Sequence, residues 1–176
     1  MTERHRDREP DPSTRVTAAF REIERTRMRG LPFLNPHLAV EAVGFAPWDA
    51  HWLGVLVSPW SMNLLLLPRI RDAWREWPQG EKRALAFPAG RFEFIGASDA
   101  LLGAYAMCSL FSPMSVFEDQ AAARLVATLA RAALLDSGNA DGDAEASARA
   151  DARATASDAP LSRRDFLRLR EPTGGA

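Results

Sequence analysis

Few residues of this 176-residue chain could perform covalent or metal chemistry. It holds one cysteine, Cys108, and three histidines, two of which, His37 and His51, lie among apolar segments. A thiolate beside a histidine could attack a carbonyl carbon, and Cys108, Met107 and His51 together could hold a soft metal. Cys108 falls within the apolar run 105–111, however, where a free cysteine is typically a small core residue. We therefore expect no catalytic residue and no metal site, with a metallocentre or redox-protecting accessory role as the alternative.

Other motifs of catalysis and cofactor binding are missing as well. The sequence has no G-x-S-x-G elbow, in which a serine nucleophile is held on a sharp strand-to-helix turn. Gly90 and Gly96 are isolated, whereas a phosphate-binding loop needs several glycines just before a helix. The sequence therefore predicts a protein that holds a partner, without a cofactor, and not an enzyme.

The composition of the chain excludes some classes of binding partner and of cellular location. A formal net charge of -1 and a pI near 6.3 argue against a nucleic-acid binder, which normally carries a basic excess. A single cysteine excludes an intrachain disulfide and fits a reducing compartment. The N-terminus is charged, and the apolar run at 64–67 is far shorter than the roughly 20 residues that cross a bilayer. We expect a cytoplasmic protein without stable membrane insertion.

Aromatic and methionine side chains are concentrated in residues 43–117, which contain all five tryptophans. Each of them could simply pack in the core. Tryptophan and methionine are also favoured where a protein grips a varied apolar segment, because they offer a large contact area and methionine can repack. We take the following apolar residues as candidates for binding a partner segment, the client-binding candidates of the later sections: Trp48, Trp52, Trp60, Met62, Phe92, Phe94, Met107 and Met114. Arg91 and Glu93 are candidates for polar contacts at the rim.

The elements that must position these residues follow from hydrophobic periodicity and from Pro and Gly breaks. Apolar positions three and four apart predict helices over 12–28 and 120–135, the second capped by Asp119 and buried through Ala122, Leu125, Val126, Leu129 and Ala133. Between them we expect strands at 38–45, 51–57, 62–67, 83–87, 91–95 and 105–111. Short links favour an α+β, two-layer sandwich in which an antiparallel sheet of about six strands carries both helices on one face.

Domain boundaries follow from changes in composition. Residues 1–11 read as a disordered charged tail and residues 12–136 as the folded domain. Residues 137–160 lack Leu, Ile, Val, Phe and Trp, so they cannot bury enough apolar surface to offset the entropy of ordering and read as a flexible linker. Residues 161–176 form a C-terminal tail.

That tail contains the consensus of twin-arginine export signals, Ser/Thr-Arg-Arg-x-Phe-Leu. The matching residues are Ser162, Arg163, Arg164, Phe166 and Leu167. An export signal stands at an N-terminus and precedes an apolar stretch, and this motif does neither. We expect it to serve another purpose, although a basic tail could also match by chance.

Several blocks of the sequence, in order, resemble the HybE-type assembly chaperones of NiFe-hydrogenases, a family that includes proteins named HupJ and HoxT. The blocks are 29–32, 35–36, 40–45, 51–64 (HWLGVLVSPWSMNL), 87–94 (FPAGRFEF) and 107–114 (MCSLFSPM), with the terminal motif. The resemblance covers roughly residues 18–135. It implies a compact α+β sandwich similar to type III secretion chaperones, and it offers no catalytic residues.

The resemblance also implies a function. Such chaperones hold the hydrogenase small-subunit precursor, with its twin-arginine signal peptide, in the cytoplasm until its metal centres are assembled; the large subunit and other maturation factors are further candidate partners. Glu93 could then pair with the arginines of the client. The terminal motif could occupy the client groove as a tethered copy, because a linker of about two dozen residues spans about 25–30 Å. Alternatively, the tail binds an export receptor or has no role.

Overall fold

The structure is a computed structural model that describes residues 8–71, 74 and 77–139. Two helices bracket six strands: α1 (Ser13–Ile23), continued by the π-helical turn η1 (Glu24–Met28), β1 (Glu41–Trp48), β2 (His51–Val57), β3 (Met62–Pro68), β4 (Lys82–Phe87), β5 (Gly90–Asp99), β6 (Gly103–Phe111), α2 (Gln120–Leu134) and the 3-10 turn η3 (Ser137–Asn139). Of the expected linker, 137–160, the structure describes the first three residues, as η3; the rest of the linker and the C-terminal tail lie outside the described residues.

The six strands form one antiparallel sheet in the order β1-β2-β3-β6-β5-β4. The neighbouring strands β2 and β3 are almost continuously apolar, and β3 is buried from Met62 to Leu67. The α+β class and the six-stranded antiparallel sheet predicted from the sequence are confirmed.

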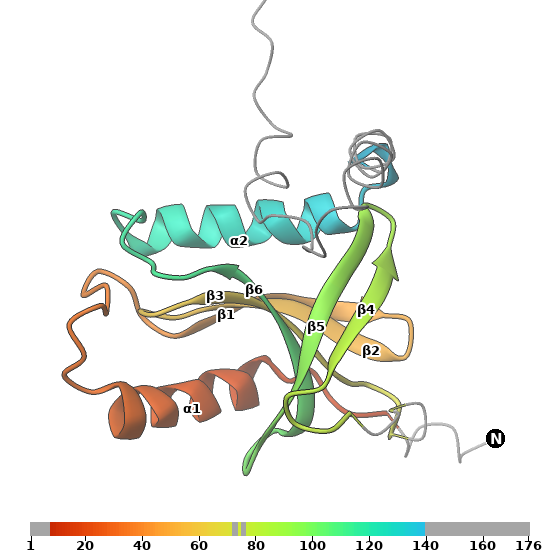
Figure 1. Ribbon diagram of the computed structural model, residues 1–176, viewed down its shortest axis with the longest axis horizontal. Coiled ribbons are helices and arrows are strands. Elements are labelled where there is room, and N and C mark those ends of the chain that lie inside the picture. Colours follow the sequence, from red (N-terminus) through yellow and green to blue (C-terminus); the bar gives the residue numbers. More distant parts are fainter. Residues whose placement is uncertain (1–7, 72–73, 75–76, 140–176) are drawn as a thin grey trace, which may run out of the picture.

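The helices lie on opposite faces of this sheet, so the expected two-layer arrangement with both helices on one face is wrong (Figure 1). Alternate residues of β3 enter two separate cores: Leu64 packs in the core beneath α2, and Leu65 in the core beneath α1. Because β3 is apolar on both faces, each face must be covered. The fold is therefore a three-layer helix–sheet–helix arrangement.

Helix α2 begins as expected, since the Asp119 carboxylate accepts a hydrogen bond from the Ala122 N–H at 2.8 Å. The residues that α2 buries against the sheet, however, differ from the predicted ones. The residues that face the sheet are Ala123, Ala127, Ala130 and Leu134, whereas Leu125 is 59% exposed. Alanines let the helix lie close to the large side chains of β2, a preference that hydrophobicity alone did not reveal.

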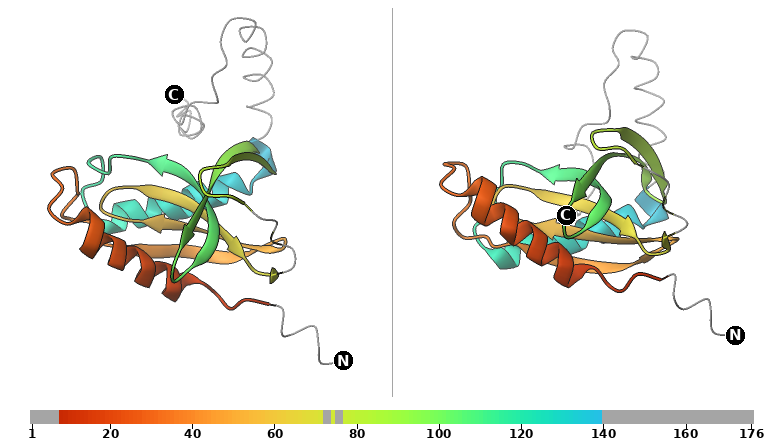
Figure 2. Two further views of the ribbon diagram at one scale, coloured as in Figure 1. Left: turned by 60° about the horizontal axis from the view of Figure 1, so that its bottom comes forward. Right: turned by 90° about the horizontal axis from the view of Figure 1, so that it is seen from below.

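The sheet is curled (Figure 2), and its edge strand β4 contacts the end of β1 through aromatic side chains. The indole of Trp48, at the end of β1, stacks on the ring of Phe87 in β4 with centroids 4.3 Å apart. The β4–β5 turn is also tied to the end of α2, because the Ala89 N–H donates to the Leu134 carbonyl at 3.2 Å. These contacts hold the two edges of the sheet around the core beneath α2.

Part of the expected N-terminal tail is attached to the domain. Arg8 forms an isolated bridge with Ile70, and the Glu9 N–H donates to the Arg69 carbonyl at 2.8 Å. The Glu9 carboxylate also pairs with the guanidinium groups of Arg15 and Arg71. The folded domain therefore includes residues 8–11.

The orientation of α2 can be tested with two leucines of the same helix. Leu134 is wholly buried, so Leu134→Ala is expected to lower the free energy of unfolding by about 2–5 kcal/mol through lost burial and a residual cavity. Leu125→Ala, the matched control, should change it by less than about 0.5 kcal/mol. Urea unfolding followed by circular dichroism measures both, and equal losses would contradict the orientation described.

Candidate functional site

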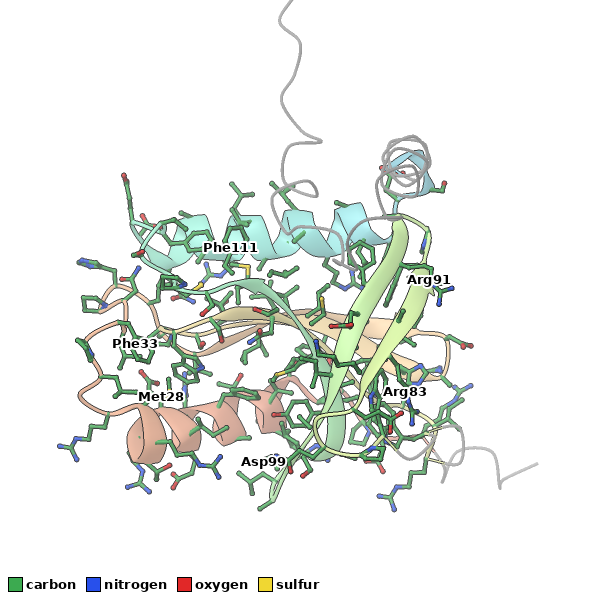
Figure 3. The ribbon with its side chains drawn as sticks, viewed as in Figure 1. Met28, Phe33, Arg83, Arg91, Asp99 and Phe111 are labelled. Atoms are coloured by element: carbon green, nitrogen blue, oxygen red, sulfur yellow. The ribbon has the colours of Figure 1, made fainter. Side chains whose placement is uncertain are left out.

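Three loops meet at one end of the sheet and form a groove. The first joins η1 to β1, the second is the β2–β3 turn, and the third joins β6 to α2. The first and third line a cleft of about 620 Å³, here named the loop groove, through Pro32, Phe33, Leu34, Asn35, Pro36, His37, Pro113, Ser115, Phe117 and Glu118. In Figure 3, Phe33 and Phe111 are labelled at this end, while Arg83 and Arg91 lie at the other.

One buried side chain holds the three loops together. The amide nitrogen of Asn35 donates to the carbonyls of Met114 at 3.0 Å and Phe117 at 2.8 Å, across more than 70 residues of chain. Its amide oxygen accepts from the His37 N–H at 2.9 Å, and its backbone N–H donates to the Pro59 carbonyl at 2.9 Å. The groove is therefore fixed by hydrogen bonds before any partner arrives.

Proline chemistry explains why this end lacks regular structure. Pro32, Pro36 and Pro113 each remove a backbone donor and bias the preceding residue away from helical geometry. The segments can therefore neither extend α1 nor join the sheet, and they fold back over its end. This leaves room for a groove where a longer strand would otherwise have continued.

The side chains that line the loop groove are mostly apolar, and one acidic residue lies at its rim. Phe33 is 49% exposed at its wall, and Val116, in the third loop, is 68% exposed. The ring of Phe117 packs edge-on against Phe111, with centroids 5.1 Å apart, and forms an aromatic wall. Glu118 adds an exposed carboxylate at the rim. Such a surface can take an apolar segment that carries a positive charge.

The client-binding candidates from the sequence divide into three groups. Met62, Phe94 and Met114 have no exposed surface and pack in the core beneath α2. Met114 lies directly behind the groove, since its carbonyl accepts a hydrogen bond from Asn35. Trp60, in the β2–β3 turn, also lies at the groove end of the sheet but is only half-buried, and the Ser112 hydroxyl donates to its carbonyl at 3.5 Å.

The other candidates lie away from the loop groove. Trp48 and Trp52 stand at the opposite end of the sheet, where the Trp52 indole N–H donates to the Glu9 carbonyl at 3.1 Å. Phe92 packs edge-on against Phe87. Met107 lies in the middle of β6, on the α1 side. The rim candidates are Arg91, whose guanidinium donates to the Ala84 carbonyl, and Glu93, which pairs with Lys82 at 2.9 Å.

The three residues considered for a metal do not come together. Met107 and Cys108 are neighbours in β6, so their side chains enter opposite cores. Cys108 of β6 pairs with Leu64 of β3, whereas His51 of β2 pairs with Pro68 at the other end of β3. This places the backbones of Cys108 and His51 about 13 Å apart along the strands and about 10 Å apart across them. Within residues 8–71, 74 and 77–139, no group of three His, Cys, Asp or Glu side chains could hold a metal ion.

His51 instead belongs to an aromatic cluster. Its ring packs against Trp74 at 5.7 Å and Trp48 at 6.2 Å between centroids, and its Nδ1 is buried without a hydrogen-bond partner in the structure. Burial lowers the pKa of His51, outweighing the nearby Asp49 carboxylate, which raises it. The imidazole is therefore favoured in its neutral form, as suits a packing residue.

The groove residues Phe33, Asn35 and Glu118 were not selected from the sequence. A signal was present: the segment from Leu31 to Pro36 combines two prolines, an asparagine and large apolar residues outside any predicted helix or strand. An apolar loop of this kind is unusual on a surface, because exposed apolar patches favour association. Its position beside the third loop could not be read from the sequence.

An α+β domain that carries a pre-formed apolar groove at one end has the architecture of a binding protein. The chain belongs to the HybE family of NiFe-hydrogenase assembly chaperones. The family described as "[NiFe]-hydrogenase assembly, chaperone, HybE" matches residues 11–169. The resemblance stated from the sequence is thereby confirmed, and the match also covers the terminal motif.

Individual relatives agree with this assignment. The hydrogenase expression/formation protein HupJ of Bradyrhizobium diazoefficiens is 39% identical over 153 residues, covering 87% of this chain and 85% of the relative. Protein HoxT of Cupriavidus necator is 41% identical over 132 residues, covering 68% of this chain and 73% of the relative. The chain spans 42% of the length of a longer relative, the "Probable rubredoxin HupJ" of Rhodobacter capsulatus, at 42% identity.

A solved structure supports the fold. The solution structure of HybE from Escherichia coli superposes with a TM-score of 0.60 at 28% identity, covering 71% of this chain and 77% of that one. Among the described residues of the present chain, every helix is too short or too polar to cross a bilayer.

The role of Asn35 as the tie between loops can be tested directly. Asn35→Ala removes the donor to two carbonyls and should lower the free energy of unfolding by about 2–4 kcal/mol, because buried acceptors are left unsatisfied. His37→Ala, an exposed residue of the same loop, should change it by less than about 0.5 kcal/mol. Chemical denaturation measures both, and a small effect of Asn35→Ala would contradict the tie.

Proposed function

We propose that this chaperone binds the precursor of a hydrogenase small subunit through its twin-arginine signal peptide and keeps it in the cytoplasm until its metal centres are complete. The observation that carries the proposal is the loop groove, an apolar cleft fixed by Asn35 and bordered by Glu118. The membership of the chain in a hydrogenase-assembly family supplies the class of client. The large subunit and other maturation factors are further partners of the same proposal.

The chemistry of the groove matches that of a twin-arginine segment. The consensus joins two arginines to a Phe-Leu pair, so it presents a planar, bidentate cation next to apolar side chains. Phe33, Phe117 and the prolines offer apolar contact, and Glu118 offers a carboxylate at the rim. Among the candidates chosen from the sequence, Met62, Met114 and Trp60 lie at the same end of the sheet, and Trp60 is the one of these three with exposed surface. The proposal therefore retains Trp60.

A pre-formed groove also suits a client segment that has no structure of its own. Binding an unstructured peptide costs entropy for the peptide, and a rigid receptor adds little to that cost. The hydrogen bonds of Asn35 hold both walls of the loop groove in place. The proposed activity therefore needs neither catalysis nor a cofactor, only occupancy that ends when the client matures.

The proposal can be tested by calorimetric titration of a synthetic twin-arginine signal peptide into the full chain. We expect saturable binding that Phe33→Ala weakens about fivefold or more, since loss of an aromatic contact at the centre of an interface typically costs more than about 1 kcal/mol. Leu101→Ala is the matched control, because Leu101 is 55% exposed in the β5–β6 turn, away from the groove. If Phe33→Ala leaves the affinity for the peptide unchanged, the loop groove is not the binding site.

The pairing of Glu118 with the arginines calls for a separate experiment with two peptides. A peptide with Lys-Lys in place of Arg-Arg should bind the unchanged protein about five- to tenfold more weakly, because lysine cannot make the bidentate contact. In Glu118→Gln, the two peptides should bind with nearly equal affinity. If Glu118→Gln still binds the Arg-Arg peptide more tightly than the Lys-Lys peptide, another acidic residue pairs with the arginines. Glu93 is then the next residue to substitute.

A further inference from the structure

The loop groove presents an apolar surface that the rest of the described chain leaves partly uncovered. Phe33 is 49% exposed and Val116 68% exposed, and both stand beside the exposed prolines of the two loops. An apolar patch of this kind invites association unless something covers it. A segment that occupies the groove in the absence of client would cover this surface.

We propose that the C-terminal segment Ser162–Leu167 of the same chain occupies the loop groove when no client is bound. This inference rests on the proposed function, because the segment carries the same Ser-Arg-Arg-x-Phe-Leu pattern as the proposed client. Phe166 and Leu167 supply the apolar pair for the groove, and Arg163 and Arg164 supply the cations for Glu118. The client then binds by displacing a tethered copy of its own recognition pattern.

The length of the chain allows this contact. Helix α2 begins two residues after Glu118 of the groove and runs away from it for 15 residues, which is about 22 Å. The described chain ends shortly afterwards, at Asn139. The 22 residues 140–161 would return over about 33 Å if wholly helical and over about 70 Å if extended. Either span exceeds the length of α2.

Charge complementarity favours this occupant. The segment brings the two cations Arg163 and Arg164. At the groove, Glu118 is exposed, whereas Glu41 on the neighbouring strand is already paired with Arg124 at 2.6 Å. A tethered segment has an effective concentration in the millimolar range, so even weak intrinsic affinity gives substantial occupancy. A segment that binds at about 100 μM would weaken the apparent affinity for client about tenfold.

The experiment compares two variants of the full chain. The first replaces the consensus residues (Arg163→Ala, Arg164→Ala, Phe166→Ala and Leu167→Ala). The second, the matched control, carries Arg168→Ala and Arg170→Ala, which removes the same number of cations from the tail outside the consensus. Hydrogen exchange of residues 31–37 and 112–118 is measured without client, and affinity for the twin-arginine peptide is measured by titration.

We expect the first variant to exchange several-fold faster at the groove and to bind the peptide about tenfold more tightly, while the control resembles the unchanged chain. The proposal is overturned if neither quantity changes, or if both change equally in the control. If the peptide binds no variant while the exchange difference persists, the proposed client is wrong and the tail contact stands. If the peptide binds all three proteins with equal affinity and exchange is unchanged, the client proposal stands and the tail contact is wrong.

Discussion

The burial of strand β3 on both of its faces is the constraint on which the rest of this structure depends. Leu64 and Leu66 enter one core, and Leu65 and Leu67 enter the other. Leaving either set in water would cost about 1.5–3 kcal/mol for each leucine, so one helix must cover each face. The order of the strands, with β3 near the middle, follows from the same requirement. The three-layer architecture is the consequence.

Covering two faces with helices from the two ends of the domain has a further effect. The chain must pass from α1 into the sheet and from the sheet into α2, and both passages lie at the same end of the molecule (Figure 1). Prolines keep these passages irregular, and Asn35 joins them through the carbonyls of Met114 and Phe117. The loop groove is thus a product of the topology, and the buried side chain of Asn35 ties its two walls together.

The separate roles of the cores and the connecting loops suit an assembly chaperone. The sheet and the two cores supply stability, while the groove is built on the loops that connect them. Cys108, Met107 and His51, the residues of the sequence best suited to chemistry, are instead used for packing on separate faces and strands. For a family described by its part in hydrogenase assembly, the feature that this domain offers to a partner is a surface.

The local features of this protein could be predicted from its sequence. Alternation and apolar runs located all six strands to within a few residues, and the Asp119 cap located the start of α2, because these signals depend on neighbours in the chain. The blocks that resemble HybE-type chaperones also identified the family. Only the tertiary structure decided which face each helix covers, which side of α2 is buried, and that Phe33 and Glu118 share a groove. Those outcomes depend on contacts between residues about 80 positions apart, and hydrophobic periodicity carries no information about such pairs.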